Sequence, residues 1–583
     1  MMSHGQFNSW IATGLQLYLA TWGVQKPPSS TNVITHELSQ FVQEVLNSST
    51  IPGLSLGVVR LTDDKKPVAE YAAWGRQTEE SKENDLTPDA LFALASCSKA
   101  FLVTSVGLLM EDYAHGRNTT PLPSALQALN WETKLKDLLP EEWAVQDAWI
   151  DSKAKLRDAF SHLTGMPRHD YSYRPGDAPA DVVGRMRHLP PAYELREQWS
   201  YNNQMFMLGA HVVAKYTNMT YGSFVAERIF KPLNMTSTSF SPSEAAKTGR
   251  LTQTWTRGVR RVPFWMSDAE DDLFAGAGGA ISNVEDMTKW LATLLNGGVD
   301  PITNRTIVPT SVLTHMTTAR AIVHGEAAKD LSIVGYGMGW FRMSYKGHDV
   351  TWHPGAIPGF SLLVAFLPAD NLGAVILTNM DDKADEAMSV LQRVIDVALD
   401  LPASSPSERS DDSQTEQPQE QIAVSADDAK PLPLGLDAYT GLYTNVGYGN
   451  ITLCSPNGTS SYCAHVLSDF AAVDAASGEQ QAETRLLAAW PRFWSTHVRM
   501  LHISDSTFRL IFPALFPRGY GLNKTAFEYY DTAVSMGRAE FLVEDGQVHG
   551  FAMITDEVVA EARAQRASGL VREIGDAWFD KVQ

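Results

Sequence analysis

The sequence predicts an α+β domain followed by an all-β domain, and three observations support this organisation. Residues 35–402 have strand-like segments at both ends and a helical middle, which predicts a mixed sheet assembled from the two ends, with an inserted helical lobe. Residues 403–431 are rich in Ser, Asp, Glu, Gln and Pro and have too few apolar side chains for a core, so we expect a linker. Residues 432–583 contain short, alternating, regularly spaced segments, which are typical of a small antiparallel barrel.

The elements of the first domain follow from the spacing of its apolar residues. Helical spacing predicts helices over 36–46, 96–115 and 384–399. Strands are predicted over 54–61, 67–74, 348–352, 360–367 and 372–378, and the first two are expected to form a hairpin. Between about 115 and 330 the pattern is helical and loop-rich.

In the second domain, strands are predicted over 451–453, 465–467, 498–501, 508–511, 539–543 and 551–554. Cys454 and Cys463 bracket a polar loop, and we expect them to close a hairpin with a disulfide. Cys97 is the third cysteine and is expected to be a small buried packing residue.

Composition and charge limit the possible partners. The chain has 583 residues, 44% of them hydrophobic and 20% charged, as in an ordinary globular protein. Its 47 basic and 67 acidic residues give a net charge of -20. Nucleic acids and anionic membranes bind basic surfaces, so neither is an expected partner. No internal apolar run reaches the length of a membrane span, so none is predicted.

The cellular compartment is predicted from two features. Residues 1–34 form an N-terminal tail in which the apolar segment 10–24 suits a signal peptide, although no Lys or Arg precedes it and Gln16 interrupts it. A tail packed on the main domain is an equal alternative. Eight of the nineteen asparagines begin N-x-[ST], the acceptor sequence for N-linked glycans: Asn47, Asn118, Asn218, Asn234, Asn304, Asn450, Asn457 and Asn523. They predict a glycoprotein on the secretory route, with the cytoplasm as the alternative.

Ser96 and Lys99 form an S-x-x-K pair that can generate a nucleophile. Residues three apart on a helix share a face, so the Lys99 amine reaches the Ser96 hydroxyl. A lysine acts as a base only when burial lowers its pKa, and the apolar residues on both sides of the pair predict such a dry setting. The pair therefore predicts a serine activated for acyl transfer. A second match at Ser152 and Lys155 lies in a charged segment, and we interpret it as a chance match.

Ser55 lies in a G-x-S-x-G sequence, which occurs in the nucleophile elbow of α/β-hydrolases. That elbow stands on a strand-to-helix turn, whereas Ser55 begins a strand that continues into the predicted hairpin. We therefore interpret this match as a chance occurrence too.

Two other segments place polar residues beside predicted elements. Tyr201-Asn202-Asn203 precedes a helical apolar run, where an asparagine N-cap and a packed tyrosine ring are the simpler explanation. His353-Pro354-Gly355-Ala356 lies between two predicted strands, where a structural histidine is the simpler explanation. Pro354 restricts its strand to a sheet edge or a bulge. An edge beside a cleft suits an extended substrate and a backbone N–H that faces an oxyanion.

Taken together, the three segments resemble the motifs of the serine β-lactamase and penicillin-binding-protein family. S-x-x-K at Ser96, Y-x-N at Tyr201 and H-x-G at His353 follow one another in the family's order. The likeness is greatest to the class C β-lactamase, D-aminopeptidase and family VIII esterase branch. Residues 156–167, 275–282 and 335–340 are also similar, and the likeness covers about 35–400. The resemblance implies a β-lactamase/transpeptidase-like fold, with an antiparallel sheet flanked by helices and a helical lobe. The last domain is similar to the lipocalin-like barrels appended to some of these hydrolases.

The resemblance implies a chemical role for each residue of the first two motifs. Ser96 is expected to be the acylated nucleophile, and Lys99 to help take its proton. Tyr201 is expected to act as general base, as a phenolate or through a proton shared with Lys99. Asn203 is expected to hydrogen-bond Lys99 or a substrate carbonyl.

The third segment is expected to bind the substrate. The resemblance implies an oxyanion hole from the backbone N–H groups of Ser96 and Ala356, with His353 and Gly355 beside the substrate. β-Lactamases and carboxypeptidases usually have Lys and Thr here for a substrate carboxylate, where this chain has His353 and Pro354. A neutral histidine and a proline bind a carboxylate poorly. We therefore expect an ester, lactone or amide substrate without an obligatory carboxylate, and no true β-lactamase activity.

These observations predict a serine hydrolase that acts on a small molecule or short peptide through an acyl-enzyme, with no metal or other cofactor. An acyltransferase that passes the same acyl group to a small-molecule acceptor is the alternative, because no motif sets the acceptor. A non-catalytic binding protein on the same fold is disfavoured because the nucleophile, lysine, tyrosine and asparagine are all present. A metallohydrolase is disfavoured because the fifteen histidines are scattered and no H-E-x-x-H occurs.

Overall fold

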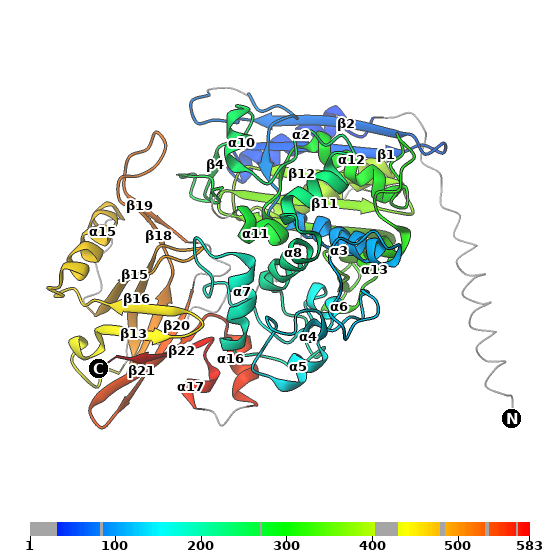
Figure 1. Ribbon diagram of the computed structural model, residues 1–583. Helices are drawn as coiled ribbons and strands as arrows, with labels where there is room; N and C mark the ends of the chain where they lie inside the picture. The colour runs from blue at the N-terminus through cyan, green and yellow to red at the C-terminus, as the bar shows by residue number, and fades with distance from the viewer. Residues whose placement is uncertain are drawn as a thin grey trace, which may run out of the picture.

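The structure is a computed structural model that describes residues 32–81, 85–268, 271–402, 430–477, 484–530, 536–566 and 570–582. Nearly all of the predicted N-terminal tail and of the predicted linker lies outside the described residues. The described chain forms a mixed α/β domain and a β-barrel, which lie side by side in Figure 1, the barrel coloured yellow to red.

The two ends of the first domain build one antiparallel sheet, as predicted. Its strand order is β2-β1-β12-β11-β10-β9-β8-β7. The strands are β1 (Gly53–Leu61), β2 (Pro67–Gly75), β7 (Ala321–His324), β8 (Val334–Tyr336), β9 (Phe341–Tyr345), β10 (His348–Ile357), β11 (Phe360–Leu367) and β12 (Leu372–Thr378). The predicted β1–β2 hairpin is confirmed, and β1 also pairs with β12 near the other end of the domain.

Helices cover both faces of this sheet. On one face, α2 (His36–Ser48) and α14 (Ala384–Ala398) share a core with β1, β11 and β12. On the other face, α12 (Val284–Leu295) packs so closely that a Cβ on Gly57 would lie 2.9 Å from the Cβ of Val284. This close approach explains a glycine of the G-x-S-x-G match. Ser55 is buried within β1, between β2 and β12, so it does not stand on a nucleophile elbow.

The helical lobe is built around α3 (Lys99–Ala114), which is buried almost throughout its length. It packs against α8 (Asn203–Thr217) and α11 (Asp271–Gly278). The remaining helices are α4 (Leu135–Leu138), α5 (Ala148–Lys153), α6 (Leu156–Phe160), α7 (Pro179–Arg185), α9 (Tyr221–Val225), α10 (Pro242–Lys247) and α13 (Thr310–Thr317). Two-stranded pairings of β3 (Phe92–Ala93) with β6 (Ile281–Ser282) and of β4 (Thr254–Trp255) with β5 (Arg261–Val262) complete the domain.

The second domain is a nearly closed eight-stranded antiparallel barrel, as predicted. Its strand order is β14-β13-β22-β21-β20-β17-β16-β15, and an isolated bridge between Cys454 and Leu487 brings the two end strands together. The strands are β13 (Gly441–Asn445), β14 (Gly449–Leu453), β15 (Arg485–Ala489), β16 (His497–Ser504), β17 (Thr507–Ile511), β20 (Met536–Glu544), β21 (Gln547–Ile554) and β22 (Ala577–Lys581). The hairpin β18 (Ala514–Phe516) and β19 (Phe527–Tyr529) and the helices α16 (Glu557–Ala564) and α17 (Val571–Ile574) flank it.

Two predictions for this domain are wrong. Residues 465–467 are not a strand but part of α15 (Ser461–Ser477), in which Cys463, Val466, Phe470 and Val473 are buried at helical spacing. The disulfide between Cys454 and Cys463 does form, but it joins the end of β14 to the first turn of α15 and closes no hairpin.

No helix in the described part of the chain is both long enough and apolar enough to cross a membrane.

Candidate active site

A tight turn at the start of α3 presents Ser96. Ala95–Ser98 form one 3₁₀ turn, η1, and Ala95 has a left-handed backbone with φ of 49°. Such a conformation costs an L-residue free energy and is held only by its surroundings. Ala95, Cys97 and Ser98 are buried, whereas Ser96 is partly exposed. The turn therefore presents a single hydroxyl at the edge of a packed core.

The amine of Lys99 lies directly beside this hydroxyl. Lys99 is 0% exposed, and its Nζ is 3.1 Å from the Oγ of Ser96. Nζ also donates to the Oδ1 of Asn203 at 2.8 Å and to the carbonyl oxygen of Ala277 at 2.7 Å. Burial, assisted by the positive charge of Arg168, holds the pKa of Lys99 well below its usual value. The dry setting predicted for the S-x-x-K pair is present.

The phenol of Tyr201 reaches the same serine oxygen. Its OH donates to the Oγ of Ser96 at 3.0 Å, so Ser96 is in contact with both the amine and the phenol. The Nζ of Lys99 lies 4.7 Å from the centre of the Tyr201 ring. The centre of the His162 ring lies 4.5 Å from the centre of the same tyrosine ring. Burial raises the pKa of Tyr201 above its usual value, which favours the protonated phenol.

The start of α8 fixes this tyrosine and the asparagine beyond it. Asn202 is the N-cap, since its Oδ1 accepts from the backbone N–H of Met205 at 3.2 Å. A cap of this kind stabilises a helix by about 1 kcal/mol. The N-cap explanation is therefore correct for Asn202, which leaves Asn203 free to bind Lys99. Sequence reasoning alone did not decide between these two asparagines.

Strand β10 forms the opposite side of the site. Strand β9 pairs only with 348–352, whereas β11 pairs with 351–357, so the second half of β10 has no strand neighbour on the β9 side, as Pro354 requires. The turn η1 lies against this half: a Cβ on Gly355 would be 2.6 Å from the carbonyl oxygen of Leu94. Ala356, the second expected oxyanion donor, is exposed here.

The side chain of His353 lies in the interior of the domain. Its side chain is buried, with Nδ1 2.6 Å from the carbonyl oxygen of Pro354 and Nε2 3.1 Å from the OH of Tyr336. A carbonyl oxygen only accepts, so we assign the hydrogen to Nδ1, and Nε2 accepts from Tyr336. Burial lowers the pKa of His353 to about 3, which keeps the ring neutral. Both ring nitrogens are therefore bonded within the domain, and the place of His353 beside the substrate stays a prediction.

Sequence reasoning missed Arg168 and Asp170. The guanidinium of Arg168 lies 5.1 Å from the centre of the Tyr201 ring, and its Nε donates to the Oδ2 of Asp170 at 2.9 Å. The Oδ1 of Asp170 accepts from the Nδ2 of Asn203 at 3.5 Å, which directs the amide oxygen of Asn203 to Lys99. Both residues directly follow the family-like stretch 156–167, and that position was the available signal.

Two other residues considered from the sequence, Ser152 and Cys97, are not part of the catalytic cluster. The Oγ of Ser152 is exposed and bonds the carbonyl oxygen of Ala148, and Lys155 pairs with Glu132, so this S-x-x-K match builds no nucleophile. Cys97 is buried, and burial raises its pKa to about 12, which keeps the thiol protonated and unreactive.

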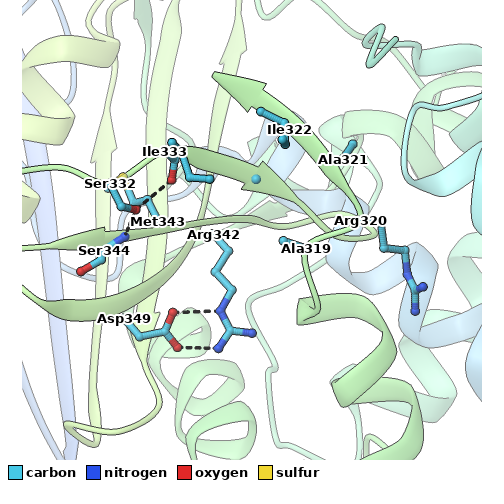
Figure 2. Close-up of a pocket in the computed structure, with 11 residues that line it drawn as sticks. Ala319, Arg320, Ala321, Ile322, Ser332, Ile333, Arg342, Met343, Ser344 and Asp349 are labelled. Atoms are coloured by element: carbon cyan, nitrogen blue, oxygen red, sulfur yellow. Dashed lines mark hydrogen bonds and ion pairs between the residues drawn. The ribbon is translucent and has the colours of Figure 1, made fainter. Parts of the chain in front are cut away.

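No group of three or more His, Cys, Asp or Glu suited to a metal ion occurs among the described residues. A surface hollow of about 360 Å³ lies at the β7–β9 edge of the sheet, where Figure 2 shows Arg342 facing Asp349 through two hydrogen bonds. None of the expected site residues lines it.

Comparisons with known proteins agree with the fold. The profile of the family described as Beta-lactamase matches residues 38–399. The unguisins hydrolase ungD' of Aspergillus campestris (strain IBT 28561) is 26% identical over 74% of this chain and 79% of its own length. The unguisins hydrolase ungD of Aspergillus violaceofuscus (strain CBS 115571) is 26% identical over 73% and 78%.

A solved structure extends the likeness to both domains. The octameric penicillin-binding protein homologue from Pyrococcus abyssi superposes with a TM-score of 0.51 at 15% identity, over 88% of this chain and 97% of its own. At that identity the likeness shows the fold. The family profile, in contrast, spans more than half of the chain and contains the Ser96, Lys99 and Tyr201 cluster. The chain therefore belongs to the β-lactamase family of serine hydrolases.

Proposed function

We propose that this protein hydrolyses an ester, lactone or amide bond of a small molecule or short peptide through an acyl-enzyme on Ser96. The observation that carries the proposal is the pair of contacts at the Oγ of Ser96, with Lys99 at 3.1 Å and Tyr201 at 3.0 Å. A nucleophile needs a base within hydrogen-bond reach, and Ser96 has two titratable neighbours at that distance.

The surroundings of Lys99 support it as the base in the first step. A neutral amine has two hydrogens and one lone pair, and Asn203 Oδ1 and Ala277 O can only accept. The two hydrogens therefore point to these oxygens, and the lone pair faces the hydroxyl of Ser96. In this arrangement the Ser96 hydroxyl donates to Lys99 while it accepts from Tyr201.

Tyr201 is then suited to deliver a proton to the leaving group. Burial favours its phenol form, so of the two expected alternatives the shared proton is favoured over a phenolate. As Ser96 attacks, its proton passes to Lys99, and the phenol of Tyr201 protonates the departing oxygen or nitrogen. The proton on Lys99 then restores the phenol, and the same groups activate water for deacylation.

The negative oxygen of the tetrahedral intermediate needs donors beside the nucleophile. The backbone N–H groups of Ser96 and Ala356 are proposed for this role, because η1 contacts the half of β10 that has no strand neighbour on the β9 side. Each such donor is typically worth about 10²–10³ in rate.

The substrate class is inferred from the third segment and from the relatives. No lysine or threonine occupies positions 353 and 354, and the nearby Arg168 is already paired with Asp170, so a free carboxylate has no dedicated site. Two relatives are named unguisins hydrolases, which supports water as the acyl acceptor here.

Labelling with a fluorophosphonate tests the proposal. We expect the folded protein to be labelled, the Ser96→Ala variant to lose the label, and Ser152→Ala and Ser55→Ala to keep it. Labelling that survives Ser96→Ala, or no labelling of the folded wild type, would overturn the nucleophile assignment. Adding alcohols or amines to a p-nitrophenyl ester assay measures transfer, and mainly transferred product would favour the acyltransferase.

A further inference from the structure

The barrel contacts the loop that carries Arg168 and Asp170. Between these two residues, the ring of His169 is held at Nδ1 by the OH of Tyr448, 2.7 Å away in the β13–β14 turn. Three residues after Asp170, the OH of Tyr173 accepts a hydrogen bond from the indole N–H of Trp494 of the barrel at 2.9 Å.

That hydrogen bond continues to the proposed base. The OH of Tyr173 donates to the Oδ1 of Asp170 at 2.8 Å, and this same oxygen accepts from the amide of Asn203. The amide oxygen of Asn203 in turn accepts from Lys99. A chain of polar contacts thus runs from Trp494 to Lys99, and each hydrogen bond in such a chain polarises the next.

The same barrel loop also supports the other acceptor of Lys99. The rings of Phe493 and Phe274 stack 4.9 Å apart, and Trp494 packs edge-on to Phe274 at 5.3 Å. Phe274 lies in α11, one turn before Ala277, whose carbonyl oxygen accepts from Lys99. Both acceptors that orient the amine are therefore braced by one loop of the barrel.

We propose that the barrel is a working part of the acyl-transfer site, in which Trp494 is a positioning residue that acts through Tyr173 and Asp170 on the amide of Asn203. The inference rests on the proposed function. It gives the barrel domain a role in orienting Lys99, the proposed base.

Two tryptophans of one loop provide a matched test in the full-length chain. Trp494→Phe removes the indole N–H that bonds Tyr173. Trp490→Phe removes an indole N–H that is buried without a hydrogen-bond partner among the described residues. Both changes remove the same atoms, so a general loosening of the barrel affects both variants, and thermal unfolding measures it.

The rate of fluorophosphonate labelling is measured against pH for both variants. We expect Trp494→Phe to label about tenfold more slowly and Trp490→Phe within about twofold of wild type. We also expect the acid side of the labelling-rate profile of Trp494→Phe to move to higher pH. A weaker hydrogen bond from Tyr173 leaves more negative charge on Asp170, and this charge raises the pKa of Lys99. Tyr173→Phe should give a similar effect, and the double variant should be no slower than the slower single one.

Equal rates and pH profiles for the two tryptophan variants would overturn the inference while leaving the proposed function intact. An unlabelled wild type would instead overturn the proposed function. Additive effects of Trp494→Phe and Tyr173→Phe would show that the two residues do not act along one path.

A second observation concerns the asparagines that begin N-x-[ST]. All eight are exposed: Asn47, Asn118, Asn218, Asn234, Asn304, Asn450, Asn457 and Asn523. Of the nine other asparagines that the structure describes, only Asn32 and Asn130 are exposed. Exposure therefore follows the acceptor sequence and not the residue type alone.

The positions suit a bulky modification. They are distributed over both domains, from the last turn of α2 at Asn47 to the loop at Asn523, and Asn457 lies within the loop closed by Cys454 and Cys463. A disulfide of this kind persists in the oxidising compartments where N-linked glycans are added.

We further propose that these eight asparagines accept N-linked oligosaccharides while the chain passes through the secretory pathway. The donor is an oligosaccharide carried on a polyprenyl diphosphate. The Nδ2 of asparagine forms a bond to the anomeric carbon, the bond from that carbon to the diphosphate oxygen breaks, and the amide proton leaves with the diphosphate.

Mass spectrometry of the full chain from a eukaryotic host tests this proposal. Peptide N-glycosidase in heavy-oxygen water converts a glycan-bearing asparagine to labelled aspartate. We expect conversion at the eight positions and none at Asn32 or Asn130, and Thr459→Ala should abolish it at Asn457 only. Absence of conversion at all eight positions would overturn the proposal.

Discussion

The Nζ of Lys99 lies 2.7 Å from the carbonyl oxygen of Ala277, an acceptor that cannot rotate away or give up a proton. With Asn203 as the other fixed acceptor, this contact leaves the lone pair of the neutral amine for Ser96. Arginine and methionine at this position both lack a neutral nitrogen with such a lone pair.

Lys99→Met is therefore expected to slow acylation by at least about 10³, because Ser96 loses its proton acceptor. Lys99→Arg should be as slow, since the guanidinium does not deprotonate. The rate of fluorophosphonate labelling measures both. Lys155→Met, in the chance S-x-x-K match, is the control and should label like wild type; a Lys99→Met rate within about tenfold of wild type would exclude Lys99 as the base.

The pH dependence of acylation should follow the two shifted groups. The base must be neutral, so the rate should rise with pH through a Lys99 pKa that lies well below 10.5, and the phenol of Tyr201 should stay protonated beyond its ordinary pKa of 10.0. Arg168 helps lower the pKa of Lys99, so Arg168→Met should move the acid limb to higher pH. Arg168→Lys keeps the positive charge and should leave the acid side of the pH–rate profile where it is in wild type. If the rate rises at the same pH in both variants, the electrostatic role of Arg168 is contradicted.

The residues that sequence reasoning found are those whose chemistry depends on side-chain type. Ser96, Lys99, Tyr201 and Asn203 each supply a group that few residue types offer, and the structure brings all of them together. The carbonyl oxygen of Ala277 could not be found in this way, because every residue has one.

Other features of the structure were not predicted from the sequence, for different physical reasons. Asp170 becomes relevant only because the fold places it between Asn203 and Tyr173, and no local pattern encodes that tertiary contact. Residues 465–467 were wrongly assigned to a strand because a short apolar pair does not reveal its period. The wider window up to Val473 shows that the apolar residues have helical spacing.

Tyr201→Phe should distinguish substrates by their leaving groups. If the phenol protonates the leaving atom, its loss should slow amide hydrolysis by about 10²–10⁴, because an amine departs only with a proton. A p-nitrophenyl ester needs no such proton and should lose much less. Steady-state kcat/KM on a matched amide and ester of the same acyl group measures the difference. Equal losses on both substrates would place the role of Tyr201 in activating Ser96 instead.

Gly355→Ala should damage the site through packing alone. The added Cβ would lie 2.6 Å from the carbonyl oxygen of Leu94, so β10 must move away from η1. Overpacking of this kind costs about 1–3 kcal/mol of stability, and the displaced oxyanion donor should lower kcat more than it changes KM. At Gly184 an added Cβ meets nothing within 4 Å, so Gly184→Ala is the control. Wild-type kcat in Gly355→Ala would show that the contact between β10 and η1 is not needed.

Two of the buried histidines, His169 and His353, should make the protein lose stability in acid. Burial lowers the pKa of His169 to about 4 and that of His353 to about 3, from the usual 6.5. The unfolded chain takes up these protons near pH 6.5 and the folded chain does not. The full contribution to stability is therefore present above pH 6.5 and declines as pH falls toward these lowered pKa values. At about pH 5 each histidine should cost on the order of 2 kcal/mol of unfolding free energy relative to neutral pH.

Urea unfolding at neutral pH and at about pH 5 measures this loss. His169→Gln and His353→Gln should be less stable at neutral pH, because each removes buried hydrogen bonds, yet each should show a smaller drop on acidification than wild type. The exposed His324 provides the control, and His324→Gln should keep the wild-type drop. An undiminished acid drop in both buried variants would mean that other groups titrate on unfolding, and that these histidines are not held neutral by burial.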